Sequence, residues 1–241
     1  MTSLSIVVPA YNEERRLRGT LERLVAFIDA RPFTFVEIVV VDDGSRDGTA
    51  ALVEEFASRD SRVRLVKNPG NRGKGYAVRH GFQEARADWV LFSDADLSSP
   101  IEEVDKLWQA ARSHGAKIAI GSRALDRSLV GVHQPVWREF AGRFFNLVMR
   151  AVTGLPFRDT QCGFKLFEAA AAREITRRQH LDGFGFDVEL LFLAKILGYP
   201  AVEVPVRWDD VVGTKVSTAR GIVAFLEPFE IRWYQITGRY R

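Results

Sequence analysis

The first 121 residues alternate short apolar runs with segments whose apolar residues recur at helical spacing. The runs predict strands at residues 4–8, 36–41, 63–66, 89–92 and 117–120. The spacing between them predicts helices at residues 14–28, 49–57, 76–85 and 101–111. Repeated strand–helix units form a mostly parallel sheet with helices on both faces. We therefore expect a Rossmann-like α/β fold whose ligands bind beyond the carboxyl ends of the strands.

The pattern changes after residue 121. We expect an amphipathic helix at 135–153, an irregular or strand-like stretch at 156–167 and a strongly apolar helix at 186–197. A strand at 201–207, a glycine-bearing loop at 209–217 and a last helix at about 218–236 would follow. No repeat, linker or low-complexity tract separates the two parts. We therefore expect one domain over residues 1–241, in which residues 122–241 pack against residues 1–121.

The composition excludes several classes of protein. With 46% hydrophobic and 27% charged residues, the 241-residue chain has the balance of a soluble globular protein. Its one cysteine, Cys162, excludes an internal disulfide, and its four histidines show no ligand spacing for zinc. A net charge of +3 is too small to indicate nucleic acid as a partner. Without a signal sequence or an apolar run long enough to span a bilayer, a cytoplasmic chain is expected.

Polar motifs directly follow all five predicted strands. Because the carboxyl ends of parallel strands meet at one edge of a sheet, these motifs should converge there. They are Pro9-Ala10-Tyr11-Asn12-Glu13, Asp42-Asp43-Gly44-Ser45, the loop 68–75, Asp94-Ala95-Asp96 and Gly121-Ser122-Arg123. Their common position is stronger evidence for a site than any one of them.

The Asp42-Asp43 pair is poorly explained by local structure alone. A turn followed by a helix N-cap accounts for Asp47 and Thr49. Two adjacent carboxylates beside a buried strand repel each other and lose hydration. A ligand with amide and hydroxyl donors, such as a uracil ring and a ribose, would compensate them.

Asp94-Ala95-Asp96 predicts a site for a hard divalent cation. Mg²⁺ and Mn²⁺ prefer oxygen ligands and often share them with substrate phosphates. The alternative is a helix-capping loop, with Ser98 or Ser99 as the cap before Pro100. The loop 70–75 adds Arg72 and Lys74 to glycines that would let backbone approach an anion, although it matches neither a Walker A loop nor a dinucleotide fingerprint.

Together these motifs resemble family 2 glycosyltransferases with the GT-A fold. The later segment Asp159-Thr160-Gln161-Cys162-Gly163-Phe164-Lys165 narrows the resemblance to polyprenyl-phosphate glycosyltransferases, and in particular to dolichyl-phosphate glucosyltransferases. The resemblance covers residues 4–217. It implies that residues 1–121 bind a nucleotide sugar and that residues 122–241 bind the acceptor and end in a C-terminal helix.

The resemblance also implies roles for individual residues. Asp94 and Asp96 would hold Mg²⁺ or Mn²⁺ and the diphosphate; Ser98 stands where mannosyltransferase relatives often have glutamine. The nucleotide-sugar site would comprise Pro9, Tyr11, Glu13, Asp42, Asp43, Gly73, Lys74, Asp94 and Ala95. The residues proposed for catalysis are Asp96, Arg123, Asp187 and Lys215.

The acceptor decides what else the site needs. A phosphate monoester is already anionic at neutral pH and needs cations, whereas a hydroxyl needs a general base. The candidate cations are Arg123, Arg138, Arg143, Lys165, Arg207 and Lys215, of which Arg123 and Lys215 rank first. A solvated helix face would equally explain Arg138 and Arg143. Asp187 is the candidate base for a hydroxyl; its alternative role is a carboxylate at a helix N-terminus.

The resemblance implies that the reaction is inverting transfer of glucose from UDP-glucose to a polyprenyl phosphate. GDP-mannose as donor and a polysaccharide hydroxyl as acceptor remain alternatives, as does a non-catalytic nucleotide-binding module. A nucleotidyltransferase would need an N-terminal glycine-rich signature, which is absent here. The aromatic and basic segments 137–150 and 225–241 are either core-packing helices or a peripheral contact with the cytoplasmic face of a membrane. No sequence feature indicates an oligomeric state.

Overall fold

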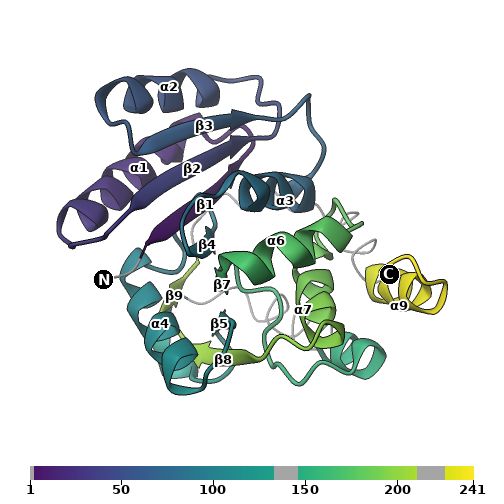
Figure 1. Ribbon diagram of the computed structural model, residues 1–241. Coiled ribbons are helices and arrows are strands. Elements are labelled where there is room, and N and C mark those ends of the chain that lie inside the picture. The colour runs from purple at the N-terminus through teal and green to yellow at the C-terminus, as the bar shows by residue number, and fades with distance from the viewer. Residues whose placement is uncertain (1–2, 133–145, 211–225) are drawn as a thin grey trace.

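One seven-stranded sheet forms the centre of the molecule. The computed structural model describes residues 3–132, 146–210 and 226–241. Within them the strand order is β3-β2-β1-β4-β7-β5-β8 (Figure 1). β7 is antiparallel to both neighbours, and the other strands run parallel to one another. The bounds are β1 Leu4–Ala10, β2 Val36–Asp42, β3 Val63–Lys67, β4 Trp89–Ser93, β5 Ile118–Ser122, β7 Phe164–Glu168 and β8 Ala201–Pro205.

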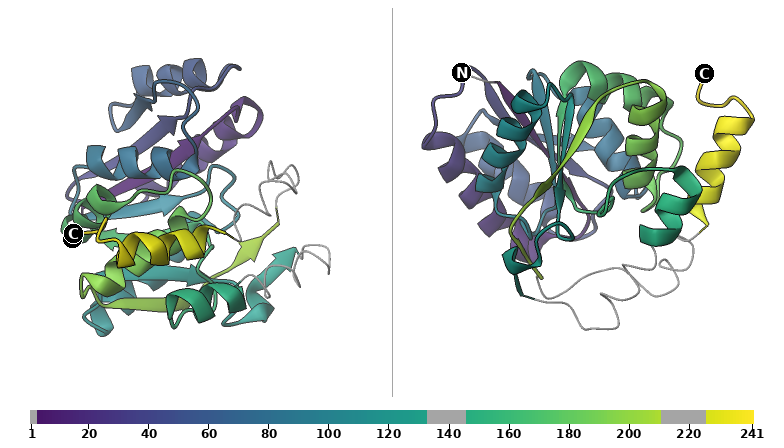
Figure 2. Two further views of the ribbon diagram at one scale, coloured as in Figure 1. Left: turned by 90° about the vertical axis from the view of Figure 1, so that its right-hand side faces the viewer. Right: turned by 90° about the horizontal axis from the view of Figure 1, so that it is seen from below.

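Helices cover both faces of this sheet. On one face α3, α6 and α7 pack against residues such as Val7 and Val41, and α9 lies outside α7. On the other face α1, α2 and α4 pack against Ile6 and Val40. Figure 2 shows the sheet edge-on between the two layers. The bounds are α1 Glu14–Asp29, α2 Thr49–Arg59, α3 Lys74–Glu84, α4 Val104–Ser113, α6 Ala169–Arg178, α7 Phe186–Ile196 and α9 Glu227–Ile236.

The sheet topology brings distant motifs to one edge. β1 lies between β2 and β4, so the loops after these three parallel strands are neighbours. Because β7 is antiparallel, its first residue, Phe164, pairs with Ser93 at the end of β4. The backbone N–H of Asp94 then donates to the carbonyl of Gly163 at 3.1 Å. The start of β7 therefore meets the ends of β1 and β4 where the crevice of a doubly wound sheet opens.

The expected α/β architecture is confirmed, with boundaries that differ by a few residues. The predicted helix at 101–111 is a 3₁₀ turn, η1 Ile101–Glu103, followed by α4. The sequence did not predict α6, whose buried face consists mainly of alanines, with Ile175 as its one large apolar residue. Nor did it predict η2 Arg127–Leu129 or the small parallel sheet of β6 Val130–Val132 and β9 Trp208–Asp209.

Parts of three predicted segments lie outside the described residues. The expected helix at 135–153 is described only from residue 146, and residues 146–153 are helical. Most of the expected loop 209–217 and the first part of the expected last helix also fall outside. Among the helices that the structure does describe, none combines the length and the hydropathy that crossing a bilayer requires.

Gly81 tests how tightly α3 packs on the sheet. A Cβ at Gly81 would lie 2.3 Å from Cγ1 of Val7 and 2.9 Å from Cγ2 of Val41. Overpacking costs about 1–3 kcal/mol, which exceeds the gain of roughly 1 kcal/mol from replacing a helical glycine. We expect Gly81→Ala to lower the free energy of unfolding, measured by urea denaturation.

Gly19 in α1 is the matched control, because a Cβ there would meet no atom within 4 Å. We expect Gly19→Ala to stabilise the protein by about 0.5–1 kcal/mol. Equal effects of the two substitutions would contradict the packing described for α3.

Candidate active site

A cleft of about 530 Å³ opens at the carboxyl edge of the sheet. Nine residues predicted for the donor and metal sites line it: Pro9, Tyr11, Glu13, Asp43, Gly73, Lys74, Asp94, Ala95 and Asp96. A second hollow, of about 570 Å³, lies on α4 around Trp108 and contains none of the motif residues. The predicted convergence of the loops after β1, β2, β3 and β4 is therefore seen in a single cleft.

Asp43 joins the loop after β2 to the loop after β3. Its Oδ1 accepts hydrogen bonds from Nδ2 of Asn68 at 2.7 Å and from the backbone N–H of Arg72 at 3.0 Å. Its Oδ2 accepts from the backbone N–H of Gly73 at 2.8 Å. The protein's own donors therefore compensate this buried carboxylate, and no ligand is needed to explain it.

Asp42 has a different position from its neighbour. It is buried, its Oδ1 accepts from the backbone N–H of Ser45 at 3.0 Å, and it is not among the residues that line the cleft. In this geometry Asp42 fixes the turn after β2, and Asp43 is the member of the pair that reaches the cleft.

The glycines at the start of α3 allow the backbone of residues 181–182 to pack closely against the helix. Gly73 has a φ of 108°, and a Cβ there would lie 2.3 Å from the carbonyl oxygen of Asp182. A Cβ on Gly75 would lie 2.6 Å from the carbonyl oxygen of Leu181, and the Gly75 N–H donates to Asp182 at 2.8 Å. These glycines therefore make room for residues 181–182, a packing role that the sequence did not predict; their close approach to an anion stays a prediction. The loop still presents the side chains of Arg72 and Lys74 to the cleft.

Asp94 is held between α3 and β7. Its Oδ1 lies 2.6 Å from Nζ of Lys74. A Cβ on Gly163 would lie 2.0 Å from its Oδ2, so only glycine fits beneath this carboxylate. Burial disfavours the charged form of Lys74, but the charges of Asp94, Asp187 and Asp96 outweigh it and raise its pKa. Lys74 therefore stays a cation in the cleft.

Asp96 sits in the turn that follows β4. Its Oδ1 accepts from the backbone N–H of Ser98 at 3.0 Å, and the turn closes with the Leu97 N–H donating to the carbonyl of Asp94 at 3.2 Å. Thr20 of α1 donates its hydroxyl to the carbonyl of Ala95 at 2.6 Å. The Asp94-Ala95-Asp96 turn is therefore fixed from two sides while both carboxylates face the cleft.

Lys165 and Asp187 form a buried ion pair behind this turn. Lys165 has no exposed surface; its Nζ donates to Oδ1 of Asp187 and, at 2.5 Å, to the carbonyl of Cys162. Burial raises the pKa of Asp187, against the opposing charges of Lys165 and Lys74. The predicted contact of Lys165 with an acceptor phosphate does not fit this geometry, because its ammonium group faces the interior.

Arg123 is anchored by a buried carboxylate. Its Nε and Nη2 donate to the two oxygens of Asp159 at 2.7 and 2.8 Å, and its guanidinium lies 5.3 Å from the centre of the Trp208 ring. Burial works against the charge of Asp159, but Arg123 lowers its pKa below the ordinary value. The Arg123 side chain keeps 30% of its surface exposed, so it can still meet an anion.

Neither Arg123 nor Arg207 is among the residues that line the described cleft. Arg207 is exposed, and its Nη2 lies 3.2 Å from Oδ2 of Asp209. Arg138, Arg143 and Lys215 lie outside the described residues. Their proposed contacts with the acceptor stay predictions.

Glu227 also lines the cleft, and no sequence motif predicted it there. It opens α9, and its neighbours in the cleft wall are Gly183 and Phe184. Burial, aided by the charges of Glu230 and Glu189, raises the pKa of Glu227 to about 7. Only the tertiary packing of α9 brings this carboxylate to the site.

The sequence profile described as "Glycosyl transferase family 2" matches residues 5–176. The chain belongs to this family. Its similar relatives include the dolichyl-phosphate beta-glucosyltransferase of Drosophila melanogaster, 38% identical over 89% of this chain and 69% of that protein. Another is the dolichyl-phosphate beta-glucosyltransferase ALG5C of Trichomonas vaginalis, 35% identical over 97% of this chain and 72% of that protein. The chain is thus a family 2 glycosyltransferase whose homologues are dolichyl-phosphate beta-glucosyltransferases.

Solved structures show the same fold at low sequence identity. Mannosyl-3-phosphoglycerate synthase from Rubrobacter xylanophilus is 19% identical, with a TM-score of 0.71 over 99% of this chain and 75% of that one. Glucosyl-3-phosphoglycerate synthase from Mycobacterium tuberculosis, solved with Mn²⁺ and UDP-glucose, is 20% identical, with a TM-score of 0.66 over 94% of this chain and 79% of that one. The fold of this family 2 glycosyltransferase is therefore GT-A.

The buried pair predicts a difference between single and double substitution. Lys165→Met leaves the Asp187 carboxylate buried beside the cleft without its nearest cation, which should cost about 3 kcal/mol or more. Lys165→Met combined with Asp187→Leu removes both charges and should be clearly less destabilising than the single change. Urea denaturation of both variants measures this.

Lys117→Met is the control, because Lys117 pairs with Glu168 at the surface, where the side chains are 47% and 32% exposed. We expect it to cost less than about 1 kcal/mol. A Lys165→Met variant as stable as Lys117→Met would show that Lys165 and Asp187 are not a buried pair.

Proposed function

We propose that this family 2 glycosyltransferase transfers glucose from UDP-glucose to a polyprenyl or dolichyl phosphate, with inversion at C1. The observation that supports it is a single cleft in which the carboxylates of Asp43, Asp94 and Asp96 face the cations of Lys74 and Arg72. The base, the ribose and the sugar hydroxyls of a nucleotide sugar can donate hydrogen bonds to these carboxylates. Its diphosphate can pair with these cations. The choice of a lipid phosphate as acceptor is supported by the relatives, which are named dolichyl-phosphate beta-glucosyltransferases.

The donor would lie along the loops of the first half of the chain. Pro9, Tyr11, Glu13 and Asp43 would hold the nucleotide, and Asp42 would keep the turn beneath Asp43 in place. Gly73, Lys74, Asp94 and Ala95 would face the diphosphate and the sugar. Residues 122–241 would supply the acceptor side of one continuous domain, since β7 and β8 complete the sheet that β1 begins.

Asp94 and Asp96 fit a divalent cation. Their carboxylate oxygens, held by the turn after β4, are the hard donors that Mg²⁺ and Mn²⁺ prefer. No group of three or more His, Cys, Asp or Glu in the described parts of the chain is arranged as a metal site, so the remaining ligands would come from the diphosphate and water. When bound, the cation would neutralise charge on the departing diphosphate.

A phosphate acceptor suits the residues around the cleft. One of its oxygens attacks C1 of the glucose, the bond from C1 to the diphosphate breaks, and UDP leaves with the electron pair. The attacking oxygen is already anionic at neutral pH and needs no general base. Arg123, held by Asp159 and Trp208, would bind that phosphate, together with Arg138, Arg207 and Lys215. Asp187 would position Lys165 and Lys74 from behind the cleft.

Transfer of labelled glucose tests the proposal. With Mn²⁺ or Mg²⁺, we expect the chain to move glucose from UDP-glucose to dolichyl or polyprenyl phosphate, and chelation by EDTA to stop the reaction. Asp96→Asn weakens the hold on the cation and should lower kcat/KM at least about 100-fold. Thermal denaturation followed by circular dichroism should show an unchanged fold.

Asp105→Asn on the outer surface of α4 is the control and should leave transfer unchanged; Asp105 pairs there with Arg31. The same assay is repeated with GDP-mannose in place of UDP-glucose. It is also repeated with an unphosphorylated polyprenol or an oligosaccharide in place of the lipid phosphate. Preference for GDP-mannose would show that UDP-glucose is not the donor. Transfer to a hydroxyl acceptor would show that the acceptor is not a lipid phosphate.

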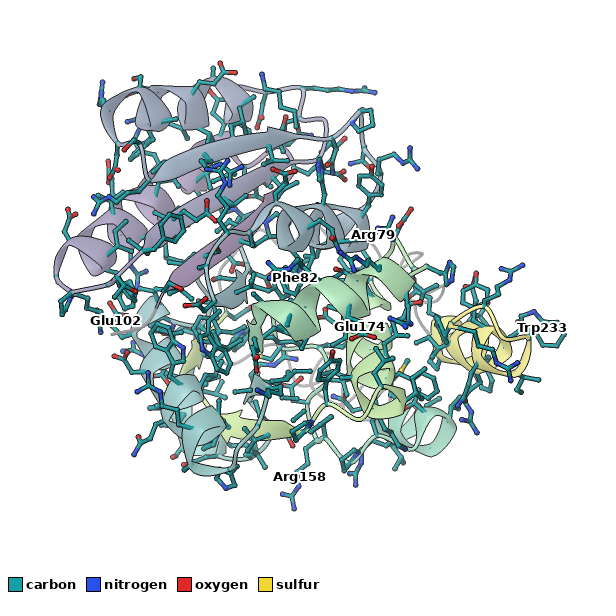
Figure 3. All side chains as sticks on the ribbon, in the orientation of Figure 1. Arg79, Phe82, Glu102, Arg158, Glu174 and Trp233 are labelled. Carbon is teal, nitrogen blue, oxygen red and sulfur yellow. The ribbon has the colours of Figure 1, made fainter. Side chains whose placement is uncertain are left out.

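We also propose that α9 carries the contact with the cytoplasmic face of a membrane in which the acceptor lies. Leu226, Phe229, Trp233 and Ile236 recur at helical spacing and are 66%, 56%, 60% and 76% exposed. Trp233 projects outward from α9, away from the rest of the molecule (Figure 3). The exposed Arg232, Arg239 and Arg241 lie on the same segment and complement anionic headgroups.

Sedimentation with vesicles tests this surface. We expect the chain to sediment with vesicles that contain an anionic phospholipid at low salt, and Phe229→Asp with Trp233→Asp to reduce the bound fraction at least about fivefold. Phe35→Asp is the control, because Phe35 is 42% exposed but precedes β2 rather than lying on α9. Equal vesicle binding of both variants would show that the membrane contact does not lie on α9. Dimerisation through α9 without vesicle binding would show that its exposed apolar residues contact a second copy of the chain.

A further inference from the structure

Glu227 is the one cleft carboxylate supplied by the C-terminal helix among the described residues. Its side chain is buried, with 8% of the residue exposed, and its Oε2 has no hydrogen-bond partner among the described residues. A buried carboxylate oxygen without a partner costs free energy, so its retention in a cleft suggests a partner that arrives with the ligand.

Two glycines make room for this carboxylate. A Cβ on Gly183 would lie 2.7 Å from Oε1 of Glu227, and a Cβ on Gly185 would lie 2.6 Å from its Oε2. The segment 183–185 therefore passes directly beneath the carboxylate. Gly183 and Phe184 line the cleft next to it, so this wall presents an aromatic side chain, bare backbone and a carboxylate.

The other walls of the cleft already match other parts of a nucleotide sugar. Pro9, Tyr11 and Asp43 form the part proposed for the nucleotide, and Lys74, Asp94 and Asp96 form the part proposed for the diphosphate. The wall made by Gly183, Phe184 and Glu227 remains for the hexose. A hexose has C–H faces that pack on an aromatic ring and hydroxyls that donate to a carboxylate, which fits the mixed apolar and polar lining of ligand pockets.

We propose that Glu227 accepts hydrogen bonds from hydroxyl groups of the donor hexose and thereby contributes to the choice of sugar. The inference rests on the proposed function, since it assigns the sugar end of the same cleft. Hydroxyls are suitable partners because they can donate to the carboxylate or accept from its protonated form. Glu230 and Glu189 are the nearby charges that favour the protonated form, and the Gly185 N–H favours the ionised one.

Paired binding measurements test the assignment. UDP and UDP-glucose differ by the hexose, so isothermal titration calorimetry with each, in the presence of Mn²⁺, isolates the contribution of the sugar. We expect Glu227→Gln to weaken UDP-glucose binding about tenfold and to change UDP binding less than about twofold. It should also reduce the discrimination between UDP-glucose and its C4 epimer UDP-galactose. Glu227→Asp, which keeps the charge on a shorter side chain, should give a smaller loss.

Glu54→Gln is the control: it removes a carboxylate from the exposed surface of α2, where Glu54 pairs with Lys67 at 2.7 Å, and should leave both affinities unchanged. Equal affinity of Glu227→Gln and the unaltered chain for UDP-glucose would overturn the assignment. A parallel loss of UDP and UDP-glucose binding would also overturn it, because Glu227 would then only pack on segment 183–185. A lower kcat with unchanged donor affinity would overturn it as well, and would make Glu227 a general base. If the unaltered chain bound neither compound, the proposed function itself would fail.

Discussion

The site depends on a line of alternating charges that runs from the interior of the protein into the cleft. Lys165 is buried against Asp187, Asp187 acts on Lys74, and Lys74 meets Asp94 at 2.6 Å. Both ammonium groups lie near the Phe92 ring, whose centre is 5.3 Å from that of Lys74 and 5.7 Å from that of Lys165. Buried charges are tolerated when each has a partner of opposite sign. Removal of one charge leaves the next one buried without a partner. The position of Asp94, and with it any cation held there, is therefore set by Lys74 and, through Lys74, by Asp187 and Lys165, which do not themselves line the cleft.

This arrangement exists because β7 enters the sheet antiparallel between β4 and β5. A parallel strand at that place would bring its end to the cleft, whereas β7 brings its beginning, so that Gly163 and Lys165 meet Asp94 and Asp187. The same reversal places Asp159, a few residues earlier, where it can fix Arg123 after β5. One change of strand direction thus connects the predicted donor side to the predicted acceptor side. It also explains why the Asp159–Lys165 segment is rich in polar residues although several of them are buried.

The sequence predicted well the strands and the meeting of the loops after β1, β2, β3 and β4 in one cleft. Apolar periodicity reports on local structure, and the carboxyl ends of parallel strands meet at one edge of a sheet. It failed where tertiary packing decides. The glycines at 73 and 75 were interpreted only as making room for an anion, but they also make room for the carbonyl oxygens of Asp182 and Leu181. Lys165 was interpreted as a ligand for phosphate, but its side chain is fully buried. Glu227 was not predicted at all, since nothing in its local sequence distinguishes it from an exposed carboxylate in the first turn of a helix.

Helix α9 joins the two proposals made for this chain. Its first turn places Glu227 in the cleft, while its outer face exposes Phe229, Trp233 and Ile236 over the following turns. A ten-residue helix is about 15 Å long, and α9 packs on α7, the helix that begins at Phe186 beside Asp187. A bilayer that holds the outer face of α9 would therefore also hold the wall of the cleft that faces the sugar. The acceptor lipid and the donor hexose would then be positioned by opposite faces of one short helix, so that the donor cleft is complete where the lipid phosphate is found.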